Sequence, residues 1–220
     1  MKAAQYAERV ACRKTCEVCS PDLENPSRVA GGTLDSDQIG PYSQWQGSLG
    51  ASLIVVAQDF ADRDAFVRYH GWPGSNVPTN VALVDLLGQA GLAIHVPNRG
   101  QPDERAFFTN AVLCLKQGGM QASVPKRCFD SCGRRFLRPL IDMIAPAVVA
   151  TLGLGALNAV LRAYGQPRAA KLGPLVSRNA RFQLSEATTL IPVVHPGSRG
   201  RQFRSLELQR QDWNRLGRLL

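Results

Sequence analysis

The sequence has no run of eighteen apolar residues, the length that a transmembrane helix needs. Its first residues, MKAAQYAERVAC, lack the apolar core and the small-residue cleavage site of a secretory signal peptide. It also contains no internal repeat and no low-complexity tract. We therefore expect a soluble, cytoplasmic protein that folds around its own core and has no membrane partner.

Acidic residues are scarce relative to basic ones. The 220 residues include 26 Lys and Arg against 17 Asp and Glu, so the net charge is +9 at pH 7. Such an excess favours a polyanionic partner, with nucleic acid as the first candidate and a membrane surface as the second. The hydrophobic fraction of 45% is enough to bury a core, which argues against a disordered chain.

Cysteine is unevenly distributed along the chain. Two thiolates separated by two residues, as in Cys16-Glu-Val-Cys19, can face one metal ion or one cluster on a tight turn. A set of buried free thiols is the alternative, whereas the chain length and the missing signal peptide disfavour a disulfide framework. Three of the six cysteines lie near the start and three lie far downstream: Cys12, Cys16 and Cys19, then Cys114, Cys128 and Cys132.

The hydrophobic pattern alternates between strands and helices. This alternation predicts an α/β protein, a three-layer α/β/α domain with a central, mainly parallel four-stranded sheet. We expect a helix and a loop-rich, cluster-binding arm over residues 1–50, and one α/β domain over 51–220 that forms a single structural unit with it. In the last helix we expect Phe203 to face the core. The predicted strands are 52–57, 106–113, 147–152 and 190–194, and the predicted helices are 3–15, 80–90, 126–144, 155–164 and 204–219.

Polar side chains follow three of the predicted strands. Asp59 comes after the first, Asn110 lies in or after the second, and His195 comes after the last. Carboxyl ends of parallel strands meet at one edge of a sheet, where such folds bind ligands. Each residue also has a structural explanation, as a helix cap, a strand-edge hydrogen bonder and a turn residue respectively. Together they are candidates for catalysis.

The segments VAQDFAD, FFTNAVLCL and VVHPGSRGR resemble the motifs of the uracil-DNA glycosylase superfamily, from Cys16 to about Arg201. The cysteines resemble those of its iron–sulfur branch, which implies a 4Fe-4S cluster, with a structural zinc as the alternative. Cys12 and Cys128 are left over, and either could replace one of the assigned ligands. The resemblance assigns these cluster ligands: Cys16, Cys19, Cys114 and Cys132.

The same resemblance assigns roles in the site. It implies that Asp59 and His195 are catalytic and that Asn110 reads the base. Gln58 and Asp59 match the cluster-free branch, whereas many cluster-containing members carry Glu-Ala there. The remaining assignments are Gln58, Phe60, Ala61 and Ser198 for substrate binding, and Arg199 and Arg201, with Arg204 as a third candidate, for DNA phosphates.

These observations predict a monomeric, monofunctional uracil-DNA glycosylase acting on uracil-containing DNA. No lysine stands at a motif position to form a Schiff base. Ala61 stands where the cluster-free branch has a tyrosine, so we expect tolerance of 5-substituted uracils. The alternative is an iron–sulfur DNA-binding or damage-sensing protein with little turnover. A serine hydrolase using Ser198, His195 and Asp59 is disfavoured because no Gly-x-Ser-x-Gly elbow follows a strand.

Overall fold

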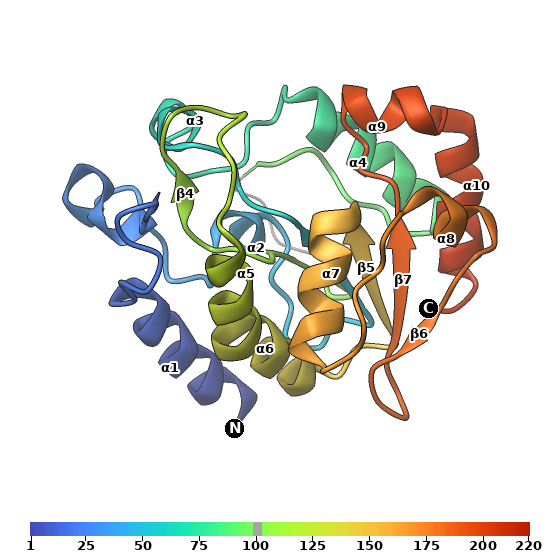
Figure 1. Cartoon of the computed structure of the whole chain (residues 1–220), viewed down its shortest axis with the longest axis horizontal. Helices are drawn as coiled ribbons and strands as arrows, with labels where there is room; N and C mark the ends of the chain where they lie inside the picture. Colours follow the sequence, from blue (N-terminus) through green and yellow to red (C-terminus); the bar gives the residue numbers. More distant parts are fainter. Residues whose placement is uncertain (99–102) are drawn as a thin grey trace.

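The computed structural model describes residues 1–98 and 103–220. Its centre is a sheet with the strand order β3-β2-β5-β7-β6, in which the first four strands run parallel (Figure 1). The predicted α/β class and the four parallel strands are confirmed. The predicted strand number was wrong by one, because β6 is a two-residue antiparallel edge strand too short to show a period. The strands are β2 (Leu53–Ala57), β3 (Ala106–Asn110), β5 (Val148–Leu152), β6 (Phe182–Gln183) and β7 (Thr189–Val193).

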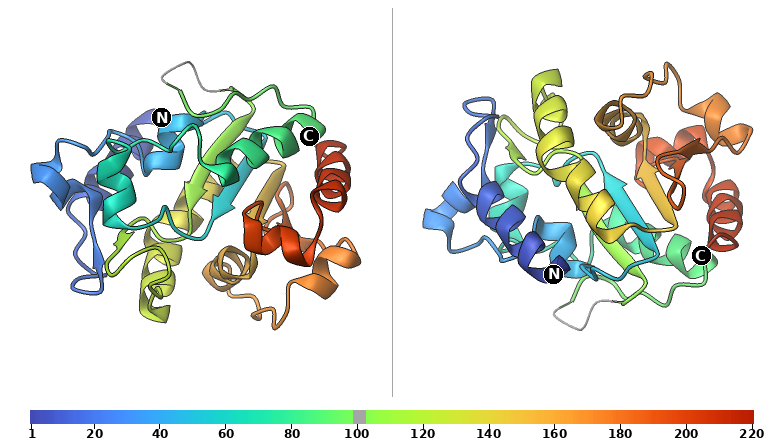
Figure 2. Two further views of the ribbon diagram at one scale, coloured as in Figure 1. Left: turned by 90° about the horizontal axis from the view of Figure 1, so that it is seen from above. Right: turned by 90° about the horizontal axis from the view of Figure 1, so that it is seen from below.

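Helices cover both faces of this sheet, which gives the expected three layers (Figure 2). The strands alternate their buried side chains between the two faces, so that Ile54 and Val56 serve one core and Leu53 and Val55 the other. One face is covered by α1 (Lys2–Lys14), α5 (Lys126–Cys132), α6 (Arg138–Ile144) and α7 (Leu154–Ala163). The other is covered by α2 (Pro41–Trp45), α4 (Pro78–Gln89) and α10 (Leu206–Gly217).

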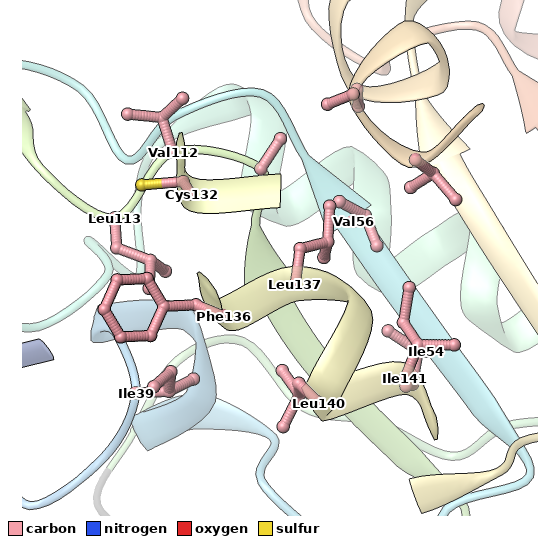
Figure 3. Packing of buried hydrophobic residues seen from close by; sticks show 14 of the residues in the cluster. Ile39, Ile54, Val56, Val112, Leu113, Cys132, Phe136, Leu137, Leu140 and Ile141 are labelled. Atoms are coloured by element: carbon pink, nitrogen blue, oxygen red, sulfur yellow. The ribbon is translucent and has the colours of Figure 1, made fainter. Parts of the chain in front are cut away.

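The helix predicted over 126–144 is present as three joined pieces. A π-helical segment, η2 (Gly133–Leu137), connects α5 to α6. Figure 3 shows Leu137 and Ile141 of this helix beside Val56 and Ile54 of β2. Each fully buried side chain of this size contributes about 1.5–3 kcal/mol. Cys128 and Cys132 of α5 belong to the same buried cluster, so this packing also holds α5 against the sheet.

The N-terminal arm contains more regular structure than expected. The predicted loop over 19–50 holds β1 (Leu23–Glu24), the 3-10 helix η1 (Pro26–Gly32) and α2. β1 pairs antiparallel with β4 (Leu115–Lys116), and Tyr6 and Val10 of α1 belong to the same buried cluster as Phe107 of β3. The buried Arg13 guanidinium lies 2.6 Å from an oxygen of Asp35. These contacts hold the arm against the sheet.

The C-terminal segment corrects one prediction. The helix expected over 204–219 is α10, which begins only after the extended Arg204 and the capping side chain of Ser205, and the residues before it form a separate helix, α9 (Ser198–Phe203). Phe203 therefore does not share the buried face of α10, and it is 83% exposed instead of facing the core. Two other short helices are α3 (Arg63–Arg68) and α8 (Gly173–Ser177). Over the described ranges, none of the helices has the length and apolarity needed to cross a membrane.

Candidate active site

Asp59 lies just beyond β2 and both of its carboxylate oxygens have partners. Oδ1 is 3.1 Å from Nζ of Lys116, and Oδ2 accepts a hydrogen bond of 2.9 Å from Nε2 of Gln58. The side chains of Asp59 and Lys116 are each 8% exposed. Lys116 also donates to the carbonyl oxygen of Met120 at 2.6 Å. The carboxylate is thus held in one orientation beside a buried cation.

Asn110 ends the neighbouring strand β3, in register with Ala57 at the end of β2. The backbone pairing continues past the strands, since Ala111 N–H donates to Ala57 O and Val112 N–H donates to Gln58 O. Asn110 is 2% exposed, and its Nδ2 has no hydrogen-bond partner within residues 1–98 and 103–220. Burying such a donor without a partner costs about 1–3 kcal/mol, which an acceptor on a ligand would recover.

His195 follows β7, and its ring orientation is set by the backbone. Nδ1 accepts a hydrogen bond of 3.0 Å from the N–H of Gly197. In a neutral imidazole the proton then resides on Nε2, which makes that atom a donor. Burial lowers the pKa of His195, and the opposing effect of the Asp59 carboxylate shows that the two groups lie within electrostatic reach. The site therefore combines a carboxylate with a neutral hydrogen-bond donor.

Two glycines allow helices to approach this edge closely. A Cβ atom on Gly155, in the first turn of α7, would lie 2.0 Å from Oε1 of Gln58. A Cβ atom on Gly200, in α9, would lie 1.9 Å from the carbonyl oxygen of His195. Both distances are far below contact, so only glycine fits at either position without displacing a site residue.

An aromatic wall stands beside Asp59. The rings of Tyr42 and Phe60 meet edge to face with centroids 5.8 Å apart, and Phe60 makes a similar contact with Phe66 at 6.0 Å. The Tyr42 hydroxyl bonds to Oδ1 of Asn80 at 3.0 Å. Burial, and then the charge of Asp59, raise the pKa of Tyr42, which keeps its hydroxyl protonated. Ala61 is 8% exposed at the end of the same loop.

Sequence reasoning missed Lys116 and Tyr42. Lys116 lies in β4, a strand of only two residues, and reaches Asp59 because it bridges to Asp62 in parallel fashion. Tyr42 belongs to α2 in the arm, which was expected to be mostly loop. Neither residue stands in a motif, so the sequence carries no signal for them beyond the proximity of Lys116 to Cys114.

The segment after His195 exposes its basic residues. Ser198 and Arg199 are exposed and Arg201 is half-buried. Arg204 is different, because Nη2 lies 2.7 Å from Oδ1 of the buried Asp212. The third phosphate candidate is therefore occupied in an internal ion pair, whereas Arg199 and Arg201 make no ion pair in the part of the chain that the structure describes.

Four of the six cysteines meet where the arm, β4 and α5 converge. Hydrogen bonds with the thiols of Cys114, Cys132 and Cys128 lower the pKa of Cys19, which places the four side chains together. All four are buried as free thiols. Every pair among them is distant in sequence except Cys128 and Cys132, so the fold and not the local chain brings them together.

The remaining two cysteines differ from each other. Cys16 is half-buried, accepts a hydrogen bond of 3.5 Å from Nη1 of Arg135, and acts electrostatically on both Cys114 and Cys132. Cys12 is exposed on α1. Among the described residues, no three His, Cys, Asp or Glu side chains are arranged to hold a metal ion.

The chain was compared with known proteins. The model of the uracil DNA glycosylase superfamily matches residues 55–217, a range that contains Asp59, Asn110 and His195. No curated protein matches the chain. Since the family match spans well over half of the chain, from within β2 to the end of α10, the protein belongs to the uracil-DNA glycosylase superfamily.

Proposed function

We propose that the protein is a monofunctional uracil-DNA glycosylase, which hydrolyses the N-glycosidic bond of a flipped-out uracil in DNA and so starts base excision repair. It would act as a monomer in the cytoplasm. The observation that carries the proposal is the unpartnered Nδ2 of Asn110, buried at the edge of the sheet where Asp59 and His195 also lie. A buried polar atom of this kind fits a ligand that supplies the missing acceptor.

Base selection would rest on Asn110. Its Nδ2 can donate to O4 of uracil while its Oδ1 accepts from N3–H. Cytosine presents the reverse pattern, with a donor at the exocyclic position and an acceptor at N3. The base must leave the DNA stack to reach this amide. Enzymes that act on a base do this by rotating the nucleotide out of the duplex into a pocket.

Departure of the base would rest on His195. Negative charge develops on O2 of uracil as the glycosidic bond breaks, and a donor fixed in advance stabilises it. The Gly197 N–H on Nδ1 directs the Nε2–H outward for this purpose. Since burial lowers the pKa of His195, the donor is a neutral imidazole.

Asp59 would stabilise the cationic sugar and orient the attacking water. Its ion pair with Lys116 holds the carboxylate in a fixed position, which favours electrostatic stabilisation over proton abstraction as its main contribution. The same pair argues for a monofunctional enzyme. A Lys116 ammonium held by Asp59 and Met120 O has no lone pair with which to form a Schiff base.

We also propose a 4Fe-4S cluster held by Cys16, Cys19, Cys114 and Cys132. When bound, the cluster would covalently join the arm, β4 and α5. The contacts of Cys19 with Cys114 and Cys132, and the proximity of Cys16, support this donor set. Each thiolate of such a cluster binds a different iron, so the ligands need not surround one point as they do for zinc. Cys128 also contacts Cys19, which makes it a stronger competing ligand than the exposed Cys12.

The pocket would tolerate substituents at C5 of uracil. Ala61 leaves room where a larger side chain would exclude them, and a methyl-sized difference is worth only about 1–3 kcal/mol of discrimination. Phe60 and Tyr42 line the neighbourhood of Asp59 and provide an aromatic face for the base.

The test is a panel of single-lesion oligonucleotides carrying uracil, 5-hydroxymethyluracil or thymine opposite guanine, with iron measured in the same preparation. Excess protein is incubated with each, and alkali then cleaves abasic sites. We expect cleavage at uracil, weaker cleavage at the substituted bases, and none with Asp59→Asn or His195→Ala. DNA binding without any cleavage would instead favour a binding or damage-sensing protein. Cleavage at uracil with no cleavage at any substituted base would show that the proposed tolerance of C5 substituents is wrong.

A further inference from the structure

Helix α9 carries an aromatic side chain that the fold does not use. Phe203 is 83% exposed, and no residue of α9 is buried. Apart from Met1 at the chain terminus, it is the most exposed large hydrophobic residue in the described ranges. Burying a phenylalanine contributes about 1.5–3 kcal/mol, which this position forgoes. Folding therefore gives no reason for an aromatic residue here.

The backbone that carries Phe203 is firmly placed beside the candidate site. Gly200 packs directly against the carbonyl of His195, and the N–H of Arg204 donates to Gly200 O at 3.0 Å. The Arg204 side chain is anchored by the buried Asp212. In Figure 1, α9 lies at the end of the sheet to which the arrow of β7 points. Phe203 thus projects from an anchored helix and not from a loose loop.

The charge around Phe203 is positive and lacks internal partners. Arg199 and Arg201 belong to the same short helix, which contains no acidic residue, and neither makes an ion pair within the described part of the chain. The arginines of the next helix are different, since Arg210 pairs with Asp85 and Arg215 with Asp212. Arg199 stands four residues before Phe203, one turn away on the same helix face, so an unneutralised charge lies next to the exposed ring.

We propose that Phe203 stacks on an unpaired base of the DNA strand that carries the target nucleotide, while Arg199 and Arg201 bind the adjoining phosphates. An aromatic face beside free cations is the combination with which proteins bind single-stranded nucleic acid, because every base has a π-face and every linkage a phosphate. A membrane surface would need a wider apolar face than one ring. The inference rests on the proposed function and names its substrate as DNA with unstacked bases beside the target.

The experiment measures binding of the full-length protein to a single-stranded oligonucleotide that contains an uncleavable uracil nucleotide flanked by 2-aminopurine. Stacking is worth about 1–3 kcal/mol per base, so Phe203→Ala should raise Kd by about 5- to 150-fold and abolish the quenching of 2-aminopurine. Phe203→Trp should retain both properties. Phe203→Leu keeps apolar bulk without a π-face and should behave like the alanine variant.

The matched control is Leu208→Ala, which removes an apolar side chain that is 41% exposed on α10 and should leave Kd unchanged. Thermal unfolding of each variant should match the wild type, because Phe203 is 83% exposed and contributes little to the core. If Phe203→Ala and the wild type have the same Kd and the same quenching, the inference is wrong, even if the protein releases uracil normally. If Phe203→Ala weakens binding but the wild type releases no uracil at enzyme excess, the stacking surface stands and the glycosylase proposal fails.

Discussion

The Nζ of Lys116 lies 3.1 Å from Oδ1 of Asp59, and only 8% of either side chain is exposed. A buried ion pair contributes little net stability, because removing both charges from water offsets their attraction. Its value here is orientation. With Gln58 on the other oxygen, the pair fixes where the negative charge of Asp59 stands before substrate arrives.

Lys116→Met should impair both stability and catalysis. Removing one partner of a buried pair leaves an uncompensated charge and costs about 3–5 kcal/mol. The single-turnover rate of uracil release should fall on the order of 10²-fold, because Asp59 loses the partner that holds its Oδ1 in place. Urea unfolding and single-turnover kinetics measure the two effects.

Two further variants separate orientation from general damage. Lys116→Arg keeps the charge and should retain most of the rate. The double variant Asp59→Asn with Lys116→Met should be more stable than Lys116→Met alone, since no unpaired carboxylate remains. A Lys116→Met protein with the wild-type rate would show that the pair does not serve catalysis.

His195 should make the stability of the protein depend on pH. Burial lowers its pKa below the ordinary value of about 6.5. Below about pH 6.5 the unfolded chain therefore binds more protons at this residue than the native protein, so the free energy of unfolding falls as pH is lowered. Above about pH 6.5 the His195 side chain is neutral in both the folded and the unfolded chain, so its full contribution to the free energy of unfolding is present.

The check is urea unfolding of the wild type and His195→Gln at about pH 8 and about pH 5. The wild type should lose more stability than the variant on acidification. Since the neutral ring is the donor, the rate of uracil release should stay level from about pH 7 to about pH 9. A rate that declined over that interval would mean that the imidazolium is required.

The sequence predicted those parts of the molecule whose periodicity is long enough to read. β2 is a run of five apolar residues and β3 begins with three, and parallel pairing then placed Asp59 and Asn110 at one edge. β4 has only two residues and no residue of α9 is buried, so neither carries an apolar pattern, which is why they were not predicted. The ion pair of Asp59 with Lys116 depends on β4, so it was visible only in three dimensions.

Phe203 shows a different limit of the sequence. Its three-residue spacing from Leu206 fits one continuous amphipathic helix, although the chain turns at Arg204. The turn is fixed by the ion pair of Arg204 with Asp212 and by the Ser205 cap, whose side chain accepts from Leu208 N–H at 3.3 Å. The hydrophobic spacing alone did not show that these polar contacts end one helix and begin another.

Asn110→Leu should abolish uracil excision while leaving the fold nearly as stable as the wild type. The variant removes an amide whose Nδ2 has no partner in the described structure, so no hydrogen bond of that nitrogen is lost. Release from its desolvation cost, about 1–3 kcal/mol, offsets the strain of repacking. Thermal unfolding measures the stability of the variant, and the alkali cleavage assay measures its excision of uracil. A large loss of stability would assign Asn110 a structural role instead.

Asn110→Asp should change base preference. A carboxylate accepts but does not donate when ionised, so it cannot serve O4 of uracil and repels it. Uracil release should fall by about 10²-fold or more, because a buried acceptor then faces another acceptor. Any gain of cleavage at cytosine, whose exocyclic amine donates, would follow the same reasoning. Uracil cleavage at the wild-type rate would remove Asn110 from the recognition site.

Replacing the proposed cluster ligands should remove iron and destabilise the arm together. Cys16→Ser and Cys132→Ser should each lower iron to about a tenth of the wild-type content or less, since metal-site formation and folding are coupled. Cys12→Ser is the matched control, because Cys12 is exposed on α1 and should leave iron and stability unchanged.

Cys128→Ser decides between the two ligands that face Cys19 from α5. Full iron in this variant assigns Cys132, whereas loss of iron in Cys128→Ser with retention in Cys132→Ser reverses the assignment. Stoichiometric zinc in place of iron in the wild type would replace the cluster with a structural metal. Because the thiols join the arm to β4 and α5 and are not themselves among the proposed catalytic and base-reading residues Asp59, His195 and Asn110, activity should decline only as far as stability does. Lost activity in a variant with wild-type stability would show that the cluster takes part in binding or chemistry.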